Sequence, residues 1–161
     1  MTTKKTQARK LISFGAVAER RRAGFDYKIG ETFEAGLSLL GAEVKSLREG
    51  RADIKGGFAE PDSKGFVLKN ISIGKYEAAD RFGKLAEKRP RQLLLNAKEI
   101  RRLIGVFNDK GSTIIPLRLY FNERGRAKVL LAIATNKQAP DKRRAVKERE
   151  AKKEAARAMK R

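Results

Sequence analysis

The chain has 161 residues, with 39 Lys and Arg against 19 Asp and Glu, and a formal net charge of +20 at pH 7. At 40% hydrophobic residues it is too apolar for a wholly disordered chain, and its excess of positive charge favours a polyanionic partner. The absence of Cys and His removes disulfides, Cys/His zinc sites and the usual proton-transfer side chain, so we expect no enzyme, no cofactor and no metal.

Charge is concentrated at the two ends. Residues 1–24, 25–139 and 140–161 carry net charges of +6, +8 and +6. We therefore predict a disordered basic extension over 1–24, one folded domain over 25–139 and a basic tail over 140–161. The apolar run at 11–18 resembles a secretory signal, but it is short and is broken by Ser13 and Gly15. We reject that interpretation and expect a cytoplasmic protein.

Alternating apolar and polar residues predict that the folded domain is mainly β. Residues 25–39 alternate as a long half-buried strand, with Gly30 and Gly36 as bulge or bend points. Residues 113–121 and 127–133 alternate in the same way, and the turn between them predicts a hairpin. Shorter candidate strands are 54–59 and 66–73. At least five strands in so small a body favour a closed or partly open barrel. The longest apolar run, 129–134, is too short to span a membrane, so we expect no membrane partner.

Two helices are predicted between the strands. Residues 42–49 form the first, which ends at Gly50. The second begins at Asn96, which with Glu99 makes a capping box. Its apolar residues recur at helical spacing and predict a stripe buried against the barrel: Ile100, Leu103, Ile104 and Phe107.

The tail from Pro140 has good helix propensity but little apolar surface. Pro140 suits a first helical position, and Glu148 and Lys152 form an i, i+4 pair. We predict a segment that is disordered alone and becomes helical against RNA. The alternative is a helix that is permanently packed on the domain.

Five sequence blocks, found in order along the chain, are similar to one known family. They cover residues 26–37, 43–50, 93–96 and 116–121, followed by 141–143 with 147–149. Together they resemble the SsrA-binding protein family, also called small protein B, over about residues 20–161. The resemblance implies an oligonucleotide-binding-type antiparallel β-barrel with flanking helices and a basic tail that is helical only when bound.

The resemblance also implies an RNA partner and a mechanism. Family members bind the tRNA-like domain of tmRNA, the SsrA RNA, and deliver it to 70S ribosomes stalled on truncated messages. The tail enters the empty mRNA channel downstream of the decoding centre. The nascent chain is then tagged and the ribosome released. Elongation factor Tu and alanyl-tRNA synthetase are implied as indirect partners through tmRNA. We expect a monomer, because so large a charge repels itself.

Two sets of residues are predicted to carry these contacts. Glu34, Leu94 and Asn96 match family residues, and the basic clusters supply phosphate contacts, although any single cation can equally be a solvated surface charge. The predicted tmRNA contacts are Arg20, Arg22, Phe25, Glu34, Lys45, Arg48, Arg89, Arg91, Leu94 and Asn96. The predicted contacts of the tail with the ribosome and the mRNA channel are Lys137, Asp141, Lys142, Arg143, Lys147, Arg149 and Met159. A long polar loop, 81–91, adds further cations.

The chain departs from the family pattern in two places. Arg20 and Phe25 stand where the family usually has Asn and His, so we expect stacking without polar readout at Phe25. Pro140 and the residues before it lack the aromatic or His that the family usually places ahead of Asp141. RNA binding is therefore expected to be better preserved than tagging.

Two other functions remain open from the residues alone. A general ribosome-associated barrel protein without a rescue role has the same composition. A nuclease or RNA-modifying enzyme would need an acidic cluster, and strand alternation points Glu31 away from Glu34. The sequence favours the first of these two alternatives.

Overall fold

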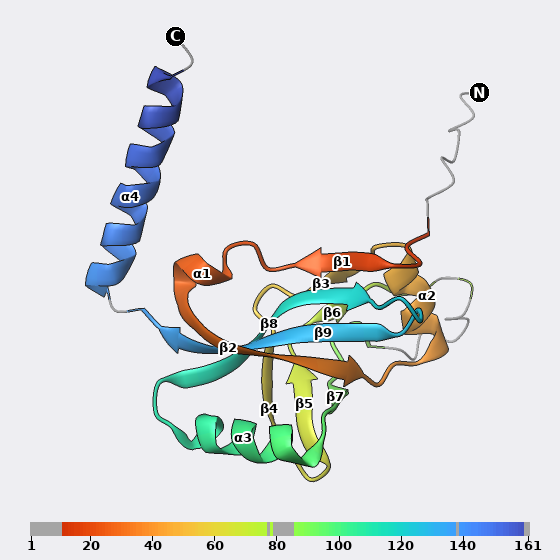
Figure 1. The fold of residues 1–161 in the computed structure, drawn as a ribbon. Coiled ribbons are helices and arrows are strands. Elements are labelled where there is room, and N and C mark those ends of the chain that lie inside the picture. The colour runs from red at the N-terminus through yellow and green to blue at the C-terminus, as the bar shows by residue number, and fades with distance from the viewer. Residues whose placement is uncertain (1–10, 77, 79–85, 138, 160–161) are drawn as a thin grey trace, which may run out of the picture.

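The computed structural model describes residues 11–76, 78, 86–137 and 139–159. Its antiparallel strands close into a barrel that is flanked by helices, and a long helix follows at the C-terminus (Figure 1). The predicted mainly β barrel with flanking helices is confirmed. The elements in chain order are β1 Gly15–Glu19, α1 Ala23–Asp26, β2 Tyr27–Leu37, α2 Gly41–Arg48, β3 Ala52–Asp53, β4 Phe58–Asp62, β5 Gly65–Lys69, β6 Ser72–Ile73, β7 Arg91–Leu94, α3 Ala97–Asn108, β8 Ser112–Phe121, β9 Ala127–Asn136 and α4 Ala139–Ala158.

The barrel closes because β8 pairs with strands on both of its edges. The ring runs β8, β4, β5, β7, β2 and β9, and β9 returns to β8. One edge of β8 is shared by two strands: Ile114 pairs with Ala59 of β4, and Phe121 pairs with Gly15 of β1. The short strands β3 and β6 pair separately. In this arrangement α1 lies at the start of β2 and α2 follows its end, so the two helices lie at opposite ends of the barrel (Figure 1).

Local sequence signals set the boundaries of several elements. The β2–β9 register shifts between Ile29 and Thr32, which confirms a bulge at Gly30. The predicted hairpin is confirmed between β8 and β9. The predicted cap of α3 is also confirmed, since the Asn96 side chain accepts a hydrogen bond from the Glu99 backbone at 2.9 Å. The predicted strand 66–73 is instead two strands, because Asn70 adopts a left-handed conformation with φ 56°.

The core fills the barrel with aliphatic and aromatic side chains. Phe66, Leu68, Leu119 and Leu131 are completely buried, and α3 adds Leu103 and Val106. The predicted stripe on α3 is wrong for two residues, because Ile104 and Phe107 are 41% and 42% exposed. The face of α3 that packs on the barrel is narrower than the apolar stripe in its sequence.

The predicted boundary at residue 25 is wrong, because the ordered domain begins earlier. Residues 15–19 form β1 and pair with β8. The Ile12 backbone donates a hydrogen bond to the Arg48 carbonyl at 2.6 Å, and Val17 packs against the core. The basic residues on both sides of this segment favoured a disordered extension, and its few apolar residues gave only a weak signal for a strand. Residues 1–10, the rest of the predicted extension, lie outside the described residues.

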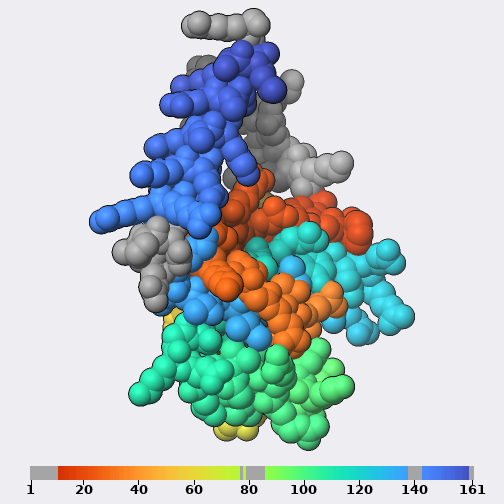
Figure 2. All heavy atoms as spheres, turned by 60° about the vertical axis from the view of Figure 1, so that its left-hand side comes forward, coloured from red at the N-terminus to blue at the C-terminus, as the bar shows by residue number. Residues whose placement is uncertain are grey.

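The C-terminal segment forms a continuous helix, α4, over Ala139–Ala158. That it becomes helical only against RNA stays a prediction. Good local propensity and the Arg144–Glu148 pair favour the helix. Residues of α4 between Arg144 and Lys153 line grooves with Arg22, Phe25 and Lys28, and the rest of the helix stands away from the barrel (Figure 2). The alternative of a helix packed along the domain over its whole length is therefore not the observed arrangement.

Candidate nucleic-acid interface

Four neighbouring strands place a row of side chains on the outer face of the barrel. Leu94 of β7 pairs with Gly36 of β2, which pairs on its other side with Lys128 of β9, and Lys128 pairs with Tyr120 of β8. Leu94 is 60% exposed. A Cβ atom built on Gly36 would lie 3.0 Å from the Leu94 Cβ, so glycine here leaves room for Leu94. The row displays an apolar side chain beside a cation and an aromatic ring.

Glu34 joins this row through its carboxylate. It accepts a hydrogen bond from the Tyr120 hydroxyl, and its other oxygen lies 3.8 Å from the Lys128 ammonium group. Burial and then the hydrogen bond to Glu34 raise the pKa of Tyr120 to about 12, so the phenol remains a donor at neutral pH. We call Glu34, Gly36, Leu94, Tyr120 and Lys128 the sheet face. Its polar groups are already oriented by one another.

Asn96 follows the last residue of β7 by two positions and lies at the start of α3. Of the three residues that match the family, Glu34 and Leu94 therefore lie on the sheet face, with Leu94 paired with Gly36 and Glu34 two residues before Gly36 on β2. Asn96 also caps α3, so its amide serves the fold in any case.

A groove continues the sheet face toward α2. It is lined by Leu94 and Lys128 from the sheet face, by Leu39 and Val44 from around α2, and by Arg126. Lys45 is exposed on α2, with its ammonium group 5.6 Å from the centre of the Tyr76 ring. An apolar floor rimmed by cations suits a nucleic acid, which offers base faces and phosphates together.

Arg48 is held largely by the protein itself. Its guanidinium donates to the Ile12 carbonyl at 3.1 Å and to the Gly125 carbonyl at 3.2 Å, and lies 4.5 Å from the centre of the Phe121 ring. These contacts tie α2 to the β8–β9 turn and to the segment before β1. Arg48 therefore has fewer donors available for RNA than Lys45.

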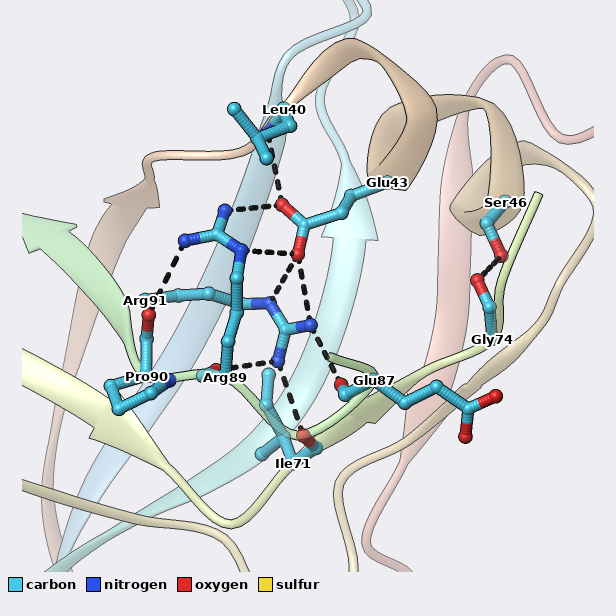
Figure 3. A network of polar contacts seen from close by, with 9 residues as sticks. All are labelled: Leu40, Glu43, Ser46, Ile71, Gly74, Glu87, Arg89, Pro90 and Arg91. Atoms are coloured by element: carbon cyan, nitrogen blue, oxygen red, sulfur yellow. Dashed lines mark hydrogen bonds and ion pairs between the residues drawn. The ribbon is translucent and has the colours of Figure 1, made fainter. Parts of the chain in front are cut away.

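The prediction that Arg91 contacts RNA is wrong. Arg91 has 0% exposure, and its five N–H groups are directed at Glu43 and at the carbonyls of Ile71, Glu87 and Arg89 (Figure 3). Arg89 is partly exposed but is bound to Glu43. Neither guanidinium is a free surface cation. The adjoining predicted cations at 81–84 lie outside the described residues.

Three predicted contacts lie at the other end of the barrel, around α1. Arg20 donates to the Gly57 carbonyl at 3.3 Å and lies 5.3 Å from the centre of the Tyr27 ring. Arg22 is exposed and Phe25 is half-buried. Arg22 and Phe25 line a groove together with Val146 and other residues of α4. These residues therefore adjoin the C-terminal helix rather than the sheet face.

The predicted tail residues are presented by α4. Arg143, Lys147 and Arg149 are exposed, and Met159, just beyond the helix, is 89% exposed. Lys137, just before the helix, donates to the Gly24 carbonyl of α1 at 2.7 Å. The side chains of Asp141 and Lys142 lie outside the described residues, although their backbone belongs to α4. Lys137 thus fixes where the helix leaves the barrel.

Sequence reasoning missed four residues of this interface: Tyr76, Tyr120, Arg126 and Lys128. The alternation in residues 127–133 already placed Lys128 on the face opposite Val129, and this signal could have identified it. Tyr120 lies on the outward side of β8, and the sequence prediction used only the apolar residues of that strand, which face the core. The approach of Tyr76 to Lys45 depends on tertiary packing, and no local signal predicts it.

Comparison with known proteins decides the family. A family model described as SmpB protein matches residues 17–161. The chain belongs to the SmpB family. The SsrA-binding protein of Maricaulis maris is 53% identical over 144 residues, which cover 89% of this chain and 92% of the relative. That of Rhodospirillum rubrum is 50% identical, with 92% and 93% covered.

A solved structure of the same family has a similar fold. It is described as "tmRNA-SmpB: a journey to the center of the bacterial ribosome", with a TM-score of 0.64 and 46% sequence identity over 79% of this chain and 86% of that chain. Within the part of the chain that the structure describes, no helix is both long and apolar enough to cross a membrane. The same residues contain no cluster of three or more His, Cys, Asp or Glu side chains able to hold a metal ion.

Proposed function

We propose that this protein binds the tRNA-like domain of tmRNA and delivers it to 70S ribosomes stalled on truncated messages. There its C-terminal helix enters the empty mRNA channel, so that the nascent chain is tagged and the ribosome is released. It acts in the cytoplasm as an RNA-binding factor and carries out no chemistry itself. The observation that carries the proposal is membership of the SmpB family over residues 17–161.

The chemistry of the sheet face supports tmRNA as the first partner. Leu94 offers an exposed apolar contact, Lys128 and Arg126 offer phosphate contacts, and Glu34 offers an oriented acceptor. Structured RNA is recognised by such a combination of apolar, backbone and hydroxyl contacts rather than by charge alone. Elongation factor Tu and alanyl-tRNA synthetase would be reached only through the bound tmRNA.

The position of α4 supports the ribosome as the second partner. The helix projects from the end of the barrel opposite α2, so the two partners can be bound at once (Figures 1 and 2). Its exposed cations suit a channel lined by RNA phosphates. Arg22 and Phe25 lie beside Val146, Arg149 and Lys153 of this helix and would face the same partner.

A competition binding assay at fixed physiological salt tests the proposal. The tRNA-like domain of tmRNA competes with an elongator tRNA and with an unrelated structured RNA of equal length. We expect a preference of about a hundredfold, or about 2.7 kcal/mol, for the tmRNA domain. Leu94→Ala should reduce this preference. The matched control is Ile104→Ala, which removes an exposed apolar side chain from α3 and should leave it unchanged.

Equal binding of all three RNAs would refute the proposal. It would favour the second candidate, a general ribosome-associated barrel protein, because charge alone binds phosphates without regard to shape. An equal effect of the two variants would show that the sheet face is not the recognition surface.

A further inference from the structure

The carboxylate of Glu43 is the centre of a buried charged cluster that no RNA contact accounts for. Glu43 lies in the first turn of α2 and is 5% exposed. One oxygen accepts from the Leu40 backbone N–H at 2.9 Å, which caps the helix. The other accepts from Arg89 Nε at 2.8 Å and Arg91 Nε at 3.0 Å (Figure 3). One side chain thus joins α2 to two cations at the start of β7.

Arg91 extends the cluster to the surrounding backbone. It donates to the Ile71 carbonyl at 3.1 Å, the Arg89 carbonyl at 3.0 Å and the Glu87 carbonyl at 2.8 Å. Nearby, Ser46 of α2 donates to the Gly74 carbonyl at 2.5 Å. These contacts fix both the position and the rotation of α2 relative to β7 and to the segment around β6.

The charge state of the cluster is secure. Burial raises the pKa of the Glu43 carboxyl, but the hydrogen bonds from Arg89 and Leu40 and the charge of Arg91 outweigh burial and lower it below its ordinary value. A buried ion pair gains little stability over well-packed apolar residues, because both charges lose their hydration. The contribution of such a cluster is therefore its geometry, since a guanidinium donates two parallel hydrogen bonds to a carboxylate in only a few orientations.

The two elements that the cluster joins carry the two halves of the candidate interface. Lys45 follows Glu43 by two residues on α2, and Leu94 follows Arg91 by three residues on β7. Val44 and Leu94 line the same groove. A rotation of α2 on β7 would change the distance between the cation and the apolar contact, although the barrel itself would remain intact.

We propose, on the basis of the function proposed above, that Glu43 is a positioning residue for RNA recognition. Its carboxylate, bound to Arg89 and Arg91, fixes the orientation of α2 relative to β7. Lys45 and Leu94 can then contact one RNA at the same time. The cluster itself touches no RNA. The cluster determines which RNA the surface prefers, and it contributes little to the positive charge of that surface.

A double-mutant cycle in RNA binding tests this role. Binding of the tmRNA tRNA-like domain and of an unrelated structured RNA is measured for the wild-type chain, Glu43→Gln, Lys45→Ala and the double variant. Glu43→Gln should lower affinity for the tmRNA domain about tenfold and affinity for the unrelated RNA by less than twofold. Lys45→Ala should then have little further effect on the Glu43→Gln protein, because coupled contacts are not additive. The control Lys98→Ala, on the exposed side of α3, should be additive with Glu43→Gln.

A purely structural role would give a different result. Partial unfolding lowers the active fraction for both RNAs equally and leaves the Lys45→Ala effect unchanged, and either finding would overturn the proposal. Arg89→Gln, which removes the more exposed partner, provides a second variant if Glu43→Gln does not fold, and the same outcomes apply to it. A wild-type chain without preference for the tmRNA domain would instead refute the proposed function, and this proposal with it.

Discussion

The sheet face and α4 differ in how their side chains are prepared for a partner. On the sheet face, Glu34 is already bound by Tyr120 and Lys128, and Leu94 has a fixed position beside Gly36. On α4 most described side chains extend into solvent, with Arg144 and Glu148 forming an ion pair at the surface. A prepared surface loses little conformational freedom on binding, whereas exposed long side chains must be ordered at that moment.

This difference shows that charge alone does not mark a binding surface. The helix α4 is rich in cations, and because it projects from the barrel it suits a partner that encloses it. The sheet face has few cations, and the selectivity proposed for it depends on shape and orientation. On that proposal, the sheet face binds the RNA while α4, at the other end of the barrel, contacts the ribosome.

Deletion of the tail should have the largest effect, because it removes the surface assigned to the ribosome and leaves the sheet face in place. Removing residues 140–161 should abolish tagging on stalled ribosomes, because the helix that enters the channel is lost. Affinity for the tRNA-like domain should change less than about threefold, since the sheet face is intact. Reconstituted translation on a truncated message measures tagging, and gel mobility shift measures binding. Loss of both activities would show that the surfaces are not independent.

Neutralising Glu43 should have the largest effect on stability. Breaking a buried ion pair from one side costs about 3–5 kcal/mol, so the urea midpoint of Glu43→Gln should fall at pH 7. Because folding lowers the pKa of Glu43, its contribution is present above the unfolded value and is lost as pH falls through the folded value. The stability difference between wild type and variant should therefore shrink in acid. Glu123→Gln, in the exposed β8–β9 turn, is the control and should change neither quantity.

Gly36→Ala should displace Leu94 and so test whether the sheet face depends on exact placement. The added Cβ would approach the Leu94 Cβ to 3.0 Å. We expect affinity for the tRNA-like domain to fall about tenfold, or about 1.4 kcal/mol, with the fold retained. Gly24→Ala meets no atom within 4 Å and is the control. Unchanged affinity in Gly36→Ala would contradict a direct role for Leu94.

Tyr120→Phe should give the smallest effect. Losing one hydrogen bond to a carboxylate costs about 1 kcal/mol, so affinity for the tRNA-like domain should fall about fivefold. In a spectrophotometric titration of the wild-type chain, one of its three tyrosines should ionise near pH 12. The variant should lack this late component. Since folding raises this pKa, the contribution of Tyr120 is complete below its unfolded value and is lost as pH rises through 12.

Local signals in the sequence predicted the barrel well. Alternation gave the long strands, the Asn96 cap gave the start of α3, and Gly30 gave the bulge in β2. Each of these depends on neighbours in sequence. The motif blocks also gave Glu34 and Leu94, which lie on the sheet face.

Long-range pairing explains what the sequence did not predict. Arg91 looks like one more surface cation in a basic chain, and its partner Glu43 lies 48 residues earlier. Likewise, the local sequence of β1 is typical of a charged extension, and only its pairing with β8 identifies it as a strand. In both cases the deciding interaction is with a distant segment, which neither propensity nor periodicity contains.

The pairing of β1 covers part of one edge of β8. Phe121 and Arg118 lie on a stretch of β8 that β4 does not reach, and β1 covers it. Without β1 the backbone N–H and C=O groups of that stretch would form an open strand edge, the kind of template on which a second chain adds a strand. A chain shortened to begin at the arginines after β1 would therefore be prone to aggregate. The pairing of β1 thus covers a strand edge as well as completing the fold.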